Sequence, residues 1–387
     1  MSSAAVYLDY ASTTPVAPEV AARMASCLTL EGTFGNPGSA SHDYGAAARA
    51  LVEEARAEVA AAVGARADEV VWTSGATEAN NLAILGVAEY YRESGRHLVT
   101  ARTEHKSVLD PCRELERRGW SVTYLSPDRE GLLDPQRVAA AIRPDTVLVS
   151  LMHVNNETGT LNDIAGIAAA CGQRGAARLH VDAAQSVGKV PVDFAALGID
   201  LMSLSAHKAY GPKGAGALIV SRRRGVHLKP LLYGGGQERA LRSGTVATHQ
   251  AVGMGAAFAL ASAVRAADGA RIAALSGRLA GTLASLGGVL RNGACGVPHI
   301  LNLSFEGVEG ESLLAAVRRD LAVSTGSACT SEVQEPSYVL RALGRDDRLA
   351  ESALRFSIGR FTTDADVDRA AGIVRAAVIR LRRIAGT

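Results

Sequence analysis

Lysine is scarce in this chain of 387 residues. Of 41 basic residues only five are lysines, at positions 106, 189, 208, 213 and 229. Arginine keeps its proton in proteins, so any amine chemistry must come from one of these five positions. The net charge is only +2, which gives no general footprint for nucleic acid or an anionic membrane. We therefore expect no direct nucleic-acid partner and no membrane partner.

Cysteines are also few and far apart, and they form no C-x-x-C pair. The five are Cys27, Cys112, Cys171, Cys295 and Cys329. This pattern excludes a disulfide framework and a zinc site, and it fits a reducing cytoplasm. The first four lie in or beside apolar segments, so we expect them to be buried. The N-terminus lacks the pattern of a secretory signal, and no membrane-spanning run is predicted.

Short β-rich runs alternate with helical patterns from about residue 45. Strands are expected at 69–73, 97–100, 122–125, 146–153, 178–181, 201–205 and 217–220, and helices at 76–93, 107–118, 135–142 and 162–174. The alternation predicts an α/β fold with a mostly parallel central sheet and helices on both faces.

The alternation of short strands and helices ends at about residue 262. Helical stretches at 256–267 and 269–287 precede strand-like segments at 300–305 and 353–358, with a helix at 310–320. The last helix begins at Thr363, which with Asp366 forms a predicted capping box. We therefore expect a large domain over residues 16–262, and a smaller α+β domain made of 1–15 and 263–387.

Two polar constellations lie at predicted strand ends. Thr73-Ser74-Gly75-Ala76-Thr77-Glu78 joins a strand to a helix, where small residues leave backbone N–H groups open to an anion such as phosphate. Simple cap geometry is the alternative, and no P-loop motif is present. Asp182 follows an apolar strand; there it either caps the next helix or pairs with a cation such as a protonated ring nitrogen.

A lysine follows the strand expected at 201–205. Lys208 is flanked by Ser205, His207 and a Gly-Pro turn, which is a poor environment for a solvated surface charge. A lysine that forms a Schiff base needs a fixed position and a depressed pKa. Asp182, 26 residues earlier, suits the nitrogen of a pyridoxal ring whose aldehyde Lys208 would hold.

The remaining cysteine lies in a different setting. Cys329 stands among small hydroxyl residues, in Ser324-Thr325-Gly326-Ser327-Ala328-Cys329-Thr330-Ser331, with no apolar periodicity. This is typical of an exposed loop thiol, so Cys329 is the candidate nucleophile.

Taken together, these motifs resemble the pyridoxal-phosphate-dependent cysteine desulfurases of the NifS/IscS type, in the class-V aminotransferase family. The resemblance runs from Tyr7 to about Arg383. It is carried by Thr33-Phe34-Gly35-Asn36-Pro37, Thr103-Glu104-His105-Lys106, Met152-His153-Val154-Asn155-Asn156-Glu157, Arg242-Ser243-Gly244-Thr245 and Ser352-Ala353-Leu354-Arg355-Phe356, besides the segments around Ser74, Asp182, Lys208 and Cys329.

The resemblance implies a fold-type I enzyme, and a role for each matching residue. Lys208 would carry pyridoxal phosphate covalently, Asp182 would pair with the ring nitrogen, and Gln185 would contact the ring hydroxyl. His105 would stack on the ring and assist proton transfer, with Asn156 beside the cofactor. The phosphate would be bound by Ala76, Thr77, Ser205, His207 and, from the other subunit of a homodimer, Thr245. Asn36, Asn156 and Arg355 would bind the substrate. Taken singly, His105 could be a core histidine and Arg355 an ion-pair partner.

The implied reaction takes sulfur from L-cysteine, leaves a persulfide on Cys329 and releases L-alanine. No resident metal is implied, although Cys329 could share a transient iron–sulfur cluster with a scaffold. Because the sequence ends at Thr387, the resemblance leads us to expect that the tail by which bacterial relatives engage that scaffold is absent. The acceptor could therefore serve iron–sulfur assembly, tRNA thiolation or DNA phosphorothioation. Selenocysteine lyase and other fold-type I enzymes are the alternatives.

Overall fold

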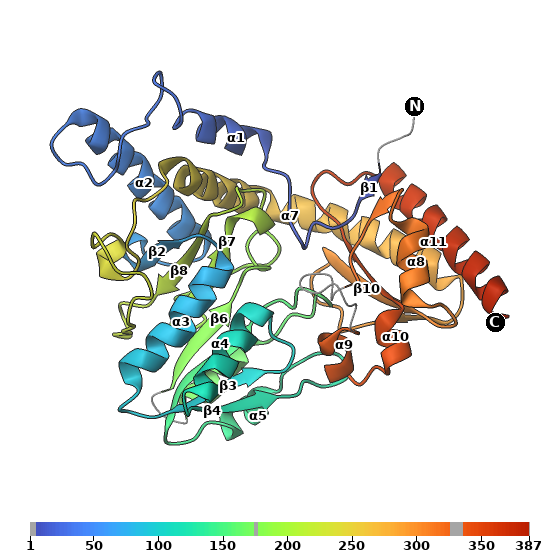
Figure 1. The fold of residues 1–387 in the computed structure, drawn as a ribbon. Helices are drawn as coiled ribbons and strands as arrows, with labels where there is room; N and C mark the ends of the chain where they lie inside the picture. The colour runs from blue at the N-terminus through green and yellow to red at the C-terminus, as the bar shows by residue number, and fades with distance from the viewer. Residues whose placement is uncertain (1–4, 174–176, 326–335, 387) are drawn as a thin grey trace.

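The computed structural model describes residues 5–173, 177–325 and 336–386. A seven-stranded sheet lies at its centre, in the order β2-β8-β7-β6-β5-β3-β4 (Figure 1). Its strands are β2 (Val70–Thr73), β3 (His97–Ala101), β4 (Ser121–Leu125), β5 (Thr146–Met152), β6 (Arg178–Asp182), β7 (Leu201–Ser205) and β8 (Gly216–Val220). Only β8 runs antiparallel to its neighbours within this sheet. The prediction of a mostly parallel sheet is confirmed.

Helices cover both faces of the central sheet, because the strands carry buried apolar side chains on both sides. On one face lie α3 (Ala76–Tyr91) and α4 (Lys106–Arg117), whose Leu82 and Val108 pack on the same apolar cluster as Leu148 of the sheet. On the other face lie α2 (Asp43–Ala62), α5 (Pro135–Ala140), α6 (Ile164–Gly172) and the first half of α7 (Thr248–Ala284). A short helix, α1 (Pro18–Ala25), packs against α7.

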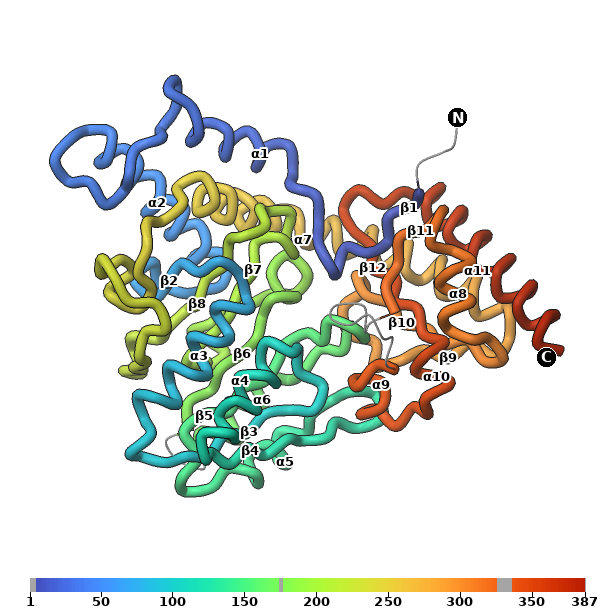
Figure 2. The backbone as a smooth tube through the Cα atoms, in the orientation of Figure 1, coloured from blue at the N-terminus to red at the C-terminus, as the bar shows by residue number. Residues whose placement is uncertain are grey.

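A second apolar core is built around a smaller sheet of order β12-β10-β9. Its elements are β9 (Val289–Arg291), β10 (Ile300–Phe305), β12 (Ala353–Ser357), α8 (Gly310–Val317), α9 (Tyr338–Ala342), α10 (Asp347–Glu351) and α11 (Asp364–Ala385). The N-terminal strand β1 (Val6–Tyr7) pairs in parallel with β11 (Leu321–Ala322). Figure 2 shows the N-terminal segment running from this unit towards the larger one. The division at residues 262 and 263 stays a prediction.

Three expectations are corrected or confirmed by local structure. α7 is one continuous helix, where the sequence predicted two stretches; Asp268-Gly269 stays helical because Phe258 packs in the first core and Leu279 in the second. By length and hydropathy α7 could span a membrane, but half of that window is buried inside the fold. The capping box of α11 is confirmed: Asp366 N donates to Thr363 Oγ1 at 3.2 Å, and Thr363 N donates to Asp366 Oδ2 at 2.9 Å.

The cysteines divide differently from the expectation. Cys27, Cys112 and Cys171 are buried as predicted, but Cys295 is exposed. It lies between β9 and β10, in a turn where Gly296 N donates to Ala294 O. The apolar residues Val297 and Ile300 that follow the turn are buried, whereas Cys295 itself points to solvent. Cys329 lies outside the described residues.

Candidate active site

The polar residues predicted at strand ends meet at one edge of the central sheet. Asp182 at the end of β6 is the register partner of Ser203 in β7, and of Met152 at the end of β5. Ser205, which ends β7, is the register partner of Gly216, as is Thr73 at the end of β2. The carboxyl ends of parallel strands are where α/β sheets bind ligands.

The first part of the site is an anion cradle at the start of α3. Gly216 lets this helix approach β7 closely, because a Cβ on Gly216 would lie 2.5 Å from Gly75 Cα and 2.7 Å from Leu204 O. Ser205 is 3% exposed, and its Oγ has no hydrogen-bond partner within the described part of the chain. The first N–H groups of a helix also lack intrahelical acceptors. Together with exposed Thr77, these donors fit a phosphate group.

The second part is the buried carboxylate of Asp182, which is 6% exposed. Asn80 Nδ2 donates to its Oδ2 at 2.8 Å, and Ala184 N donates to its Oδ1 at 3.0 Å. Both donors are uncharged, so a protonated ring nitrogen would complete the balance of charge. Turns, and not a helix, follow Asp182, so the alternative of a helix cap is wrong.

The third part is Lys208, at the end of a 3-10 turn (Ala206–Lys208) that follows β7. Its Nζ donates to Ala11 O and to Ser12 O, each at 2.7 Å. The adjoining His207 contacts Thr13 Oγ1 through Nδ1 at 3.1 Å. Burial, together with Lys208, Lys213 and Lys189, lowers the pKa of His207 to about 4, so its ring is neutral and suited to donate one hydrogen bond.

The charges of Asp182 and Lys208 both act on the pKa of His105, in opposite directions. It is the N-cap of α4, where Ser107 N donates to its Nδ1 at 3.1 Å. Burial lowers the pKa of His105; the Asp182 carboxylate opposes that effect and Lys208 adds to it. The neutral ring therefore carries its proton on Nε2, away from the backbone of α4.

The fourth part is an arginine held by the N-terminal segment. Arg355 in β12 is 3% exposed, and it donates to Asn156 O at 2.9 Å, Asp9 Oδ1 at 2.8 Å and Ser12 Oγ at 2.7 Å. Its Nε is buried and has no partner among the residues that the structure describes. A guanidinium fixed on one side with a donor left over is suited to bind a carboxylate.

Two predicted residues are not brought to this edge within one chain. Asn36 is exposed on the connection between α1 and α2, where its Oδ1 accepts from Gly38 N at 2.8 Å. This connection lies at the opposite end of the larger unit from β12 (Figure 1). Thr245 is exposed on the segment that precedes α7. The predicted nucleophile, Cys329, is not among the described residues.

Several residues at the site were not found from the sequence. Asn80 orients Asp182, and Ala11, Ser12 and Asp9 hold Lys208 and Arg355. Asn80 carried a weak signal, because a polar residue in the apolar stretch of a helix is unusual. The N-terminal residues carried none, because they act through backbone carbonyls and through a contact 346 positions away in the sequence.

A lysine at a strand end, a buried carboxylate and an anion cradle at a helix start define a pyridoxal-phosphate-dependent enzyme of fold-type I. The polar groups present fit that cofactor. Ser205 Oγ, which has no partner among the described residues, lies at the phosphate cradle, and the Asp182 carboxylate has uncharged hydrogen-bond donors that leave it able to pair with a cation.

Comparisons with known proteins agree. The model of the class-V aminotransferase family matches residues 6–370. The chain is 57% identical over 381 residues to Cysteine desulfurase IscS of Pseudomonas syringae pv. tomato, covering 98% of this chain and 94% of that one. The identity to Cysteine desulfurase IscS of Azotobacter vinelandii is also 57% over 381 residues, with the same coverage.

Solved structures give the same result. A NifS-like protein superposes with a TM-score of 0.90 at 32% identity, over 96% of this chain and 98% of that one. DndA from Streptomyces lividans superposes with a TM-score of 0.78 at 45% identity, over 91% and 99%. The chain therefore belongs to the class-V aminotransferase family and, within it, to the cysteine desulfurases, whose cofactor is pyridoxal phosphate.

Proposed function

We propose that this enzyme takes the sulfur of L-cysteine onto Cys329 and releases L-alanine, using the site at the carboxyl edge of the central sheet. The observation that carries the proposal is the convergence on one edge of Lys208, Asp182 and the unpartnered Ser205 Oγ. Arg355, from the second core, faces the same segment of chain, residues 9–12, that holds Lys208.

In the proposed arrangement Lys208 holds the cofactor, and Ala76, Thr77, Ser205 and His207 bind its phosphate. Asp182 keeps a proton on the ring nitrogen, and Asn80 and Ala184 N–H hold its carboxylate in place. When bound, pyridoxal phosphate supplies an electron sink for negative charge that develops on the substrate. His105 stacks on the ring, and Gln185 and Asn156 complete its surroundings.

The substrate is bound and oriented by Arg355. Its Nη2 is engaged by Asp9 and Ser12 and one N–H of Nη1 by Asn156 O, so the buried Nε–H and the second N–H of Nη1 are left for the carboxylate of cysteine. Such orientation fixes which bonds of the substrate lie near His105 and Lys208. His105, neutral because burial lowers its pKa, exchanges a proton with the substrate at Nε2.

The sulfur step falls to Cys329, which is assigned from the sequence. Its thiolate sulfur forms a bond to the sulfur of the substrate while the carbon–sulfur bond breaks. The electron pair of the broken bond and a proton go to the carbon that becomes the methyl group of alanine. The enzyme keeps a persulfide, whose outer sulfur passes to an acceptor protein. Iron–sulfur assembly, tRNA thiolation and DNA phosphorothioation are the candidate destinations.

The proposal also covers the oligomeric state, the domain boundaries and the cellular compartment. The chain would act as a homodimer, in which exposed Thr245 completes the partner's phosphate site. Residues 16–262 would form the large domain, and 1–15 with 263–387 the small one that carries Cys329. The four free cysteines among the described residues support a reducing compartment, the cytoplasm.

The test uses two variants and two controls. Lys208→Ala should lose the visible absorption of the bound cofactor, and Cys329→Ser should keep it but release no sulfide from L-cysteine in the presence of a thiol reductant. Lys229→Ala and Cys295→Ser alter an exposed lysine and an exposed thiol, and both should behave as wild type. A colourless wild type incubated with pyridoxal phosphate would contradict the cofactor site. Wild-type sulfide release by Cys329→Ser would contradict the role of the thiol.

A further inference from the structure

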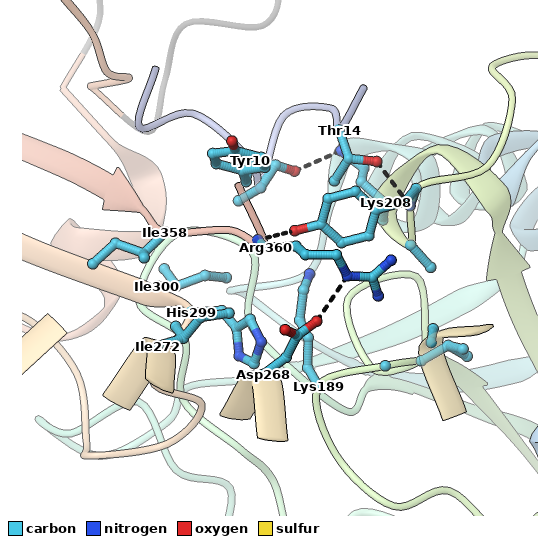
Figure 3. Close-up of a pocket in the computed structure, with 16 residues that line it drawn as sticks. Tyr10, Thr14, Lys189, Lys208, Asp268, Ile272, His299, Ile300, Ile358 and Arg360 are labelled. Carbon is cyan, nitrogen blue, oxygen red and sulfur yellow. Dashed lines mark hydrogen bonds and ion pairs between the residues drawn. The ribbon is translucent and has the colours of Figure 1, made fainter. Parts of the chain in front are cut away.

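A second lysine lies behind Lys208. Lys189 lines a small cavity of about 20 Å³ between the two cores, with Lys208, His299 and Asp268 also in its wall. Figure 3 shows Lys189 beside His299 and Asp268 in this cavity. The sequence pattern predicts no role for Lys189, and the proposed reaction does not use it.

Lys189 is linked to Lys208 through one glutamine and one carbonyl. Lys189 Nζ donates to Gln185 Oε1, and Gln185 Nε2 donates to Ala11 O at 2.8 Å. The same carbonyl of Ala11 accepts from Lys208 Nζ at 2.7 Å. An amide has one acceptor end and one donor end. The contact with Lys189 therefore fixes the acceptor end of Gln185, and its donor end must face the side of Lys208.

The surroundings keep Lys189 in this place. His299 is 7% exposed, and its Nδ1 has no partner among the described residues. The cavity has room for about one water, which could accept from the second N–H of Lys189 and donate to this nitrogen. The groups that face Lys189 or share its cavity wall are Tyr10, Lys208, Tyr210, Asp268, His299, Arg355 and Arg360. Burial, Lys208 and Arg355 lower the pKa of Lys189 to about 7.

We propose that Lys189 is a positioning residue for the cofactor: through Gln185 it directs an amide N–H at the ring hydroxyl oxygen. The inference rests on the proposed placement of the cofactor at Lys208. It extends that placement, because it explains why Gln185 presents its donor end to the ring and not its carbonyl.

The contact with Gln185 acts on the proton held between Lys208 nitrogen and the ring hydroxyl oxygen. An N–H aimed at that oxygen stabilises it as an anion and so eases the loss of the proton. Removing Lys189 should therefore raise the pH at which this proton leaves, by up to about one pH unit, the effect of one hydrogen bond to the anion.

The experiment is a pH titration of the visible absorption of the cofactor-loaded protein. In Lys189→Met the midpoint should move to higher pH by up to about one unit. Lys189→Arg keeps the donor, so its midpoint should stay near that of wild type. Lys229→Met, the same substitution at an exposed lysine, should leave the midpoint unchanged. If Lys189→Met does not fold, Lys189→Leu, which also lacks the donor, is titrated instead, under the same criteria.

The outcomes separate this inference from the proposed site. If wild type and Lys189→Met share one midpoint, or if the midpoint of Lys189→Met moves to lower pH, the positioning role is wrong while the cofactor site stands. If wild type shows no visible band and Lys208→Ala does not differ from it, the site itself is wrong. A shift in Lys189→Met that Lys189→Arg reverses supports the inference, because a merely structural lysine would not move the titration of the cofactor.

Discussion

A buried ion pair holds the segment that precedes Thr245. Arg56 on α2 donates to both carboxylate oxygens of Glu238 at 2.8 and 2.9 Å, and the side chains are 8% and 4% exposed. Trp72 N in β2 donates to the same carboxylate at 2.9 Å. Burial lowers the pKa of Arg56, but Glu238 and Glu53 more than compensate, and the net pKa is raised.

The pair stabilises a turn that the backbone alone disfavours. Glu238, Arg239 and Ala240 have φ values of 49°, 58° and 61°, so three successive residues with side chains are left-handed. Each such residue costs about 1 to 2 kcal/mol. The Glu238 side chain must offset this cost, because it ties the start of the turn to α2 and β2.

The substitution Glu238→Gln removes the charge but keeps the shape and an oxygen for Trp72 N–H. It leaves the buried Arg56 with the neutral Val70 O and with the carboxylate of Glu53, whose side chain is 56% exposed. Breaking a buried pair on one side costs about 3 to 5 kcal/mol, and the remaining Glu53 contact favours the lower end. We therefore expect the free energy of unfolding in urea to fall by about 3 kcal/mol.

Matched variants make the measurement decisive. Glu114→Gln disrupts exposed pairs with Arg117 and Arg118 and should cost less than about 1 kcal/mol. The double variant Arg56→Met with Glu238→Gln should cost less than the sum of the two single changes by at least about 1 kcal/mol, because no charge is left buried. If Glu238→Gln costs no more than Glu114→Gln, or if the single costs simply add, the pair does not hold the turn.

The strained turn and two buried titratable groups can also be tested. Ala240→Gly should raise the free energy of unfolding by about 1 kcal/mol, because glycine relieves the left-handed conformation. The control Ala259→Gly, on the exposed face of α7, should lower the free energy of unfolding by about 1 kcal/mol. Equal effects of the two substitutions in urea unfolding would contradict the strain. Burial raises the pKa of Glu104 well above its ordinary value, so the native state holds a proton that the unfolded chain releases, and stability falls as pH rises. Unfolding of Glu104→Gln at pH 6 and 8 should show a smaller loss on this rise than wild type, and an equal loss would refute it. Burial lowers the pKa of His180 to about 3, so its stability contribution is lost as pH falls below about 6.5, and His180→Gln should flatten the acid limb of the stability curve.

The fold could largely be predicted from periodicity, because both faces of the central sheet are covered. Most of its strands are short β-rich runs with buried apolar residues. In the smaller sheet, β10 has the predicted bounds. The central sheet's one antiparallel strand, β8, could not be foreseen. Its five residues are apolar throughout, so their pattern is the same in either direction. The prediction of two separate helices that meet near Gly269 is wrong. Glycine is tolerated there because the two halves of α7 pack on different cores.

The residues of the candidate site also include some that the sequence pattern predicts and some that it does not. Lys208 and Asp182 could be predicted from the sequence because Asp182 ends β6 and Lys208 closes the turn after β7, where side chains emerge at the ligand-binding edge. Their supports could not be found in this way. Asn80 is brought to Asp182 by the packing of α3 on the sheet, over 102 positions of sequence. Lys189 looked like an ordinary lysine until the cavity and the contact with Gln185 were known.

The N-terminal segment shows why such supports matter for the reaction. Lys208 belongs to the larger core and Arg355 to the smaller one, yet both are held by residues 9–12, which cross from one to the other. Ser12 holds both at once: its carbonyl accepts from Lys208, and its hydroxyl accepts from Arg355. A displacement of one core against the other would have to break these contacts or carry the segment with it. The distance between Lys208 and Arg355, which in the proposed function hold the cofactor and orient the substrate, is therefore set by this short stretch of chain, and not by either core alone.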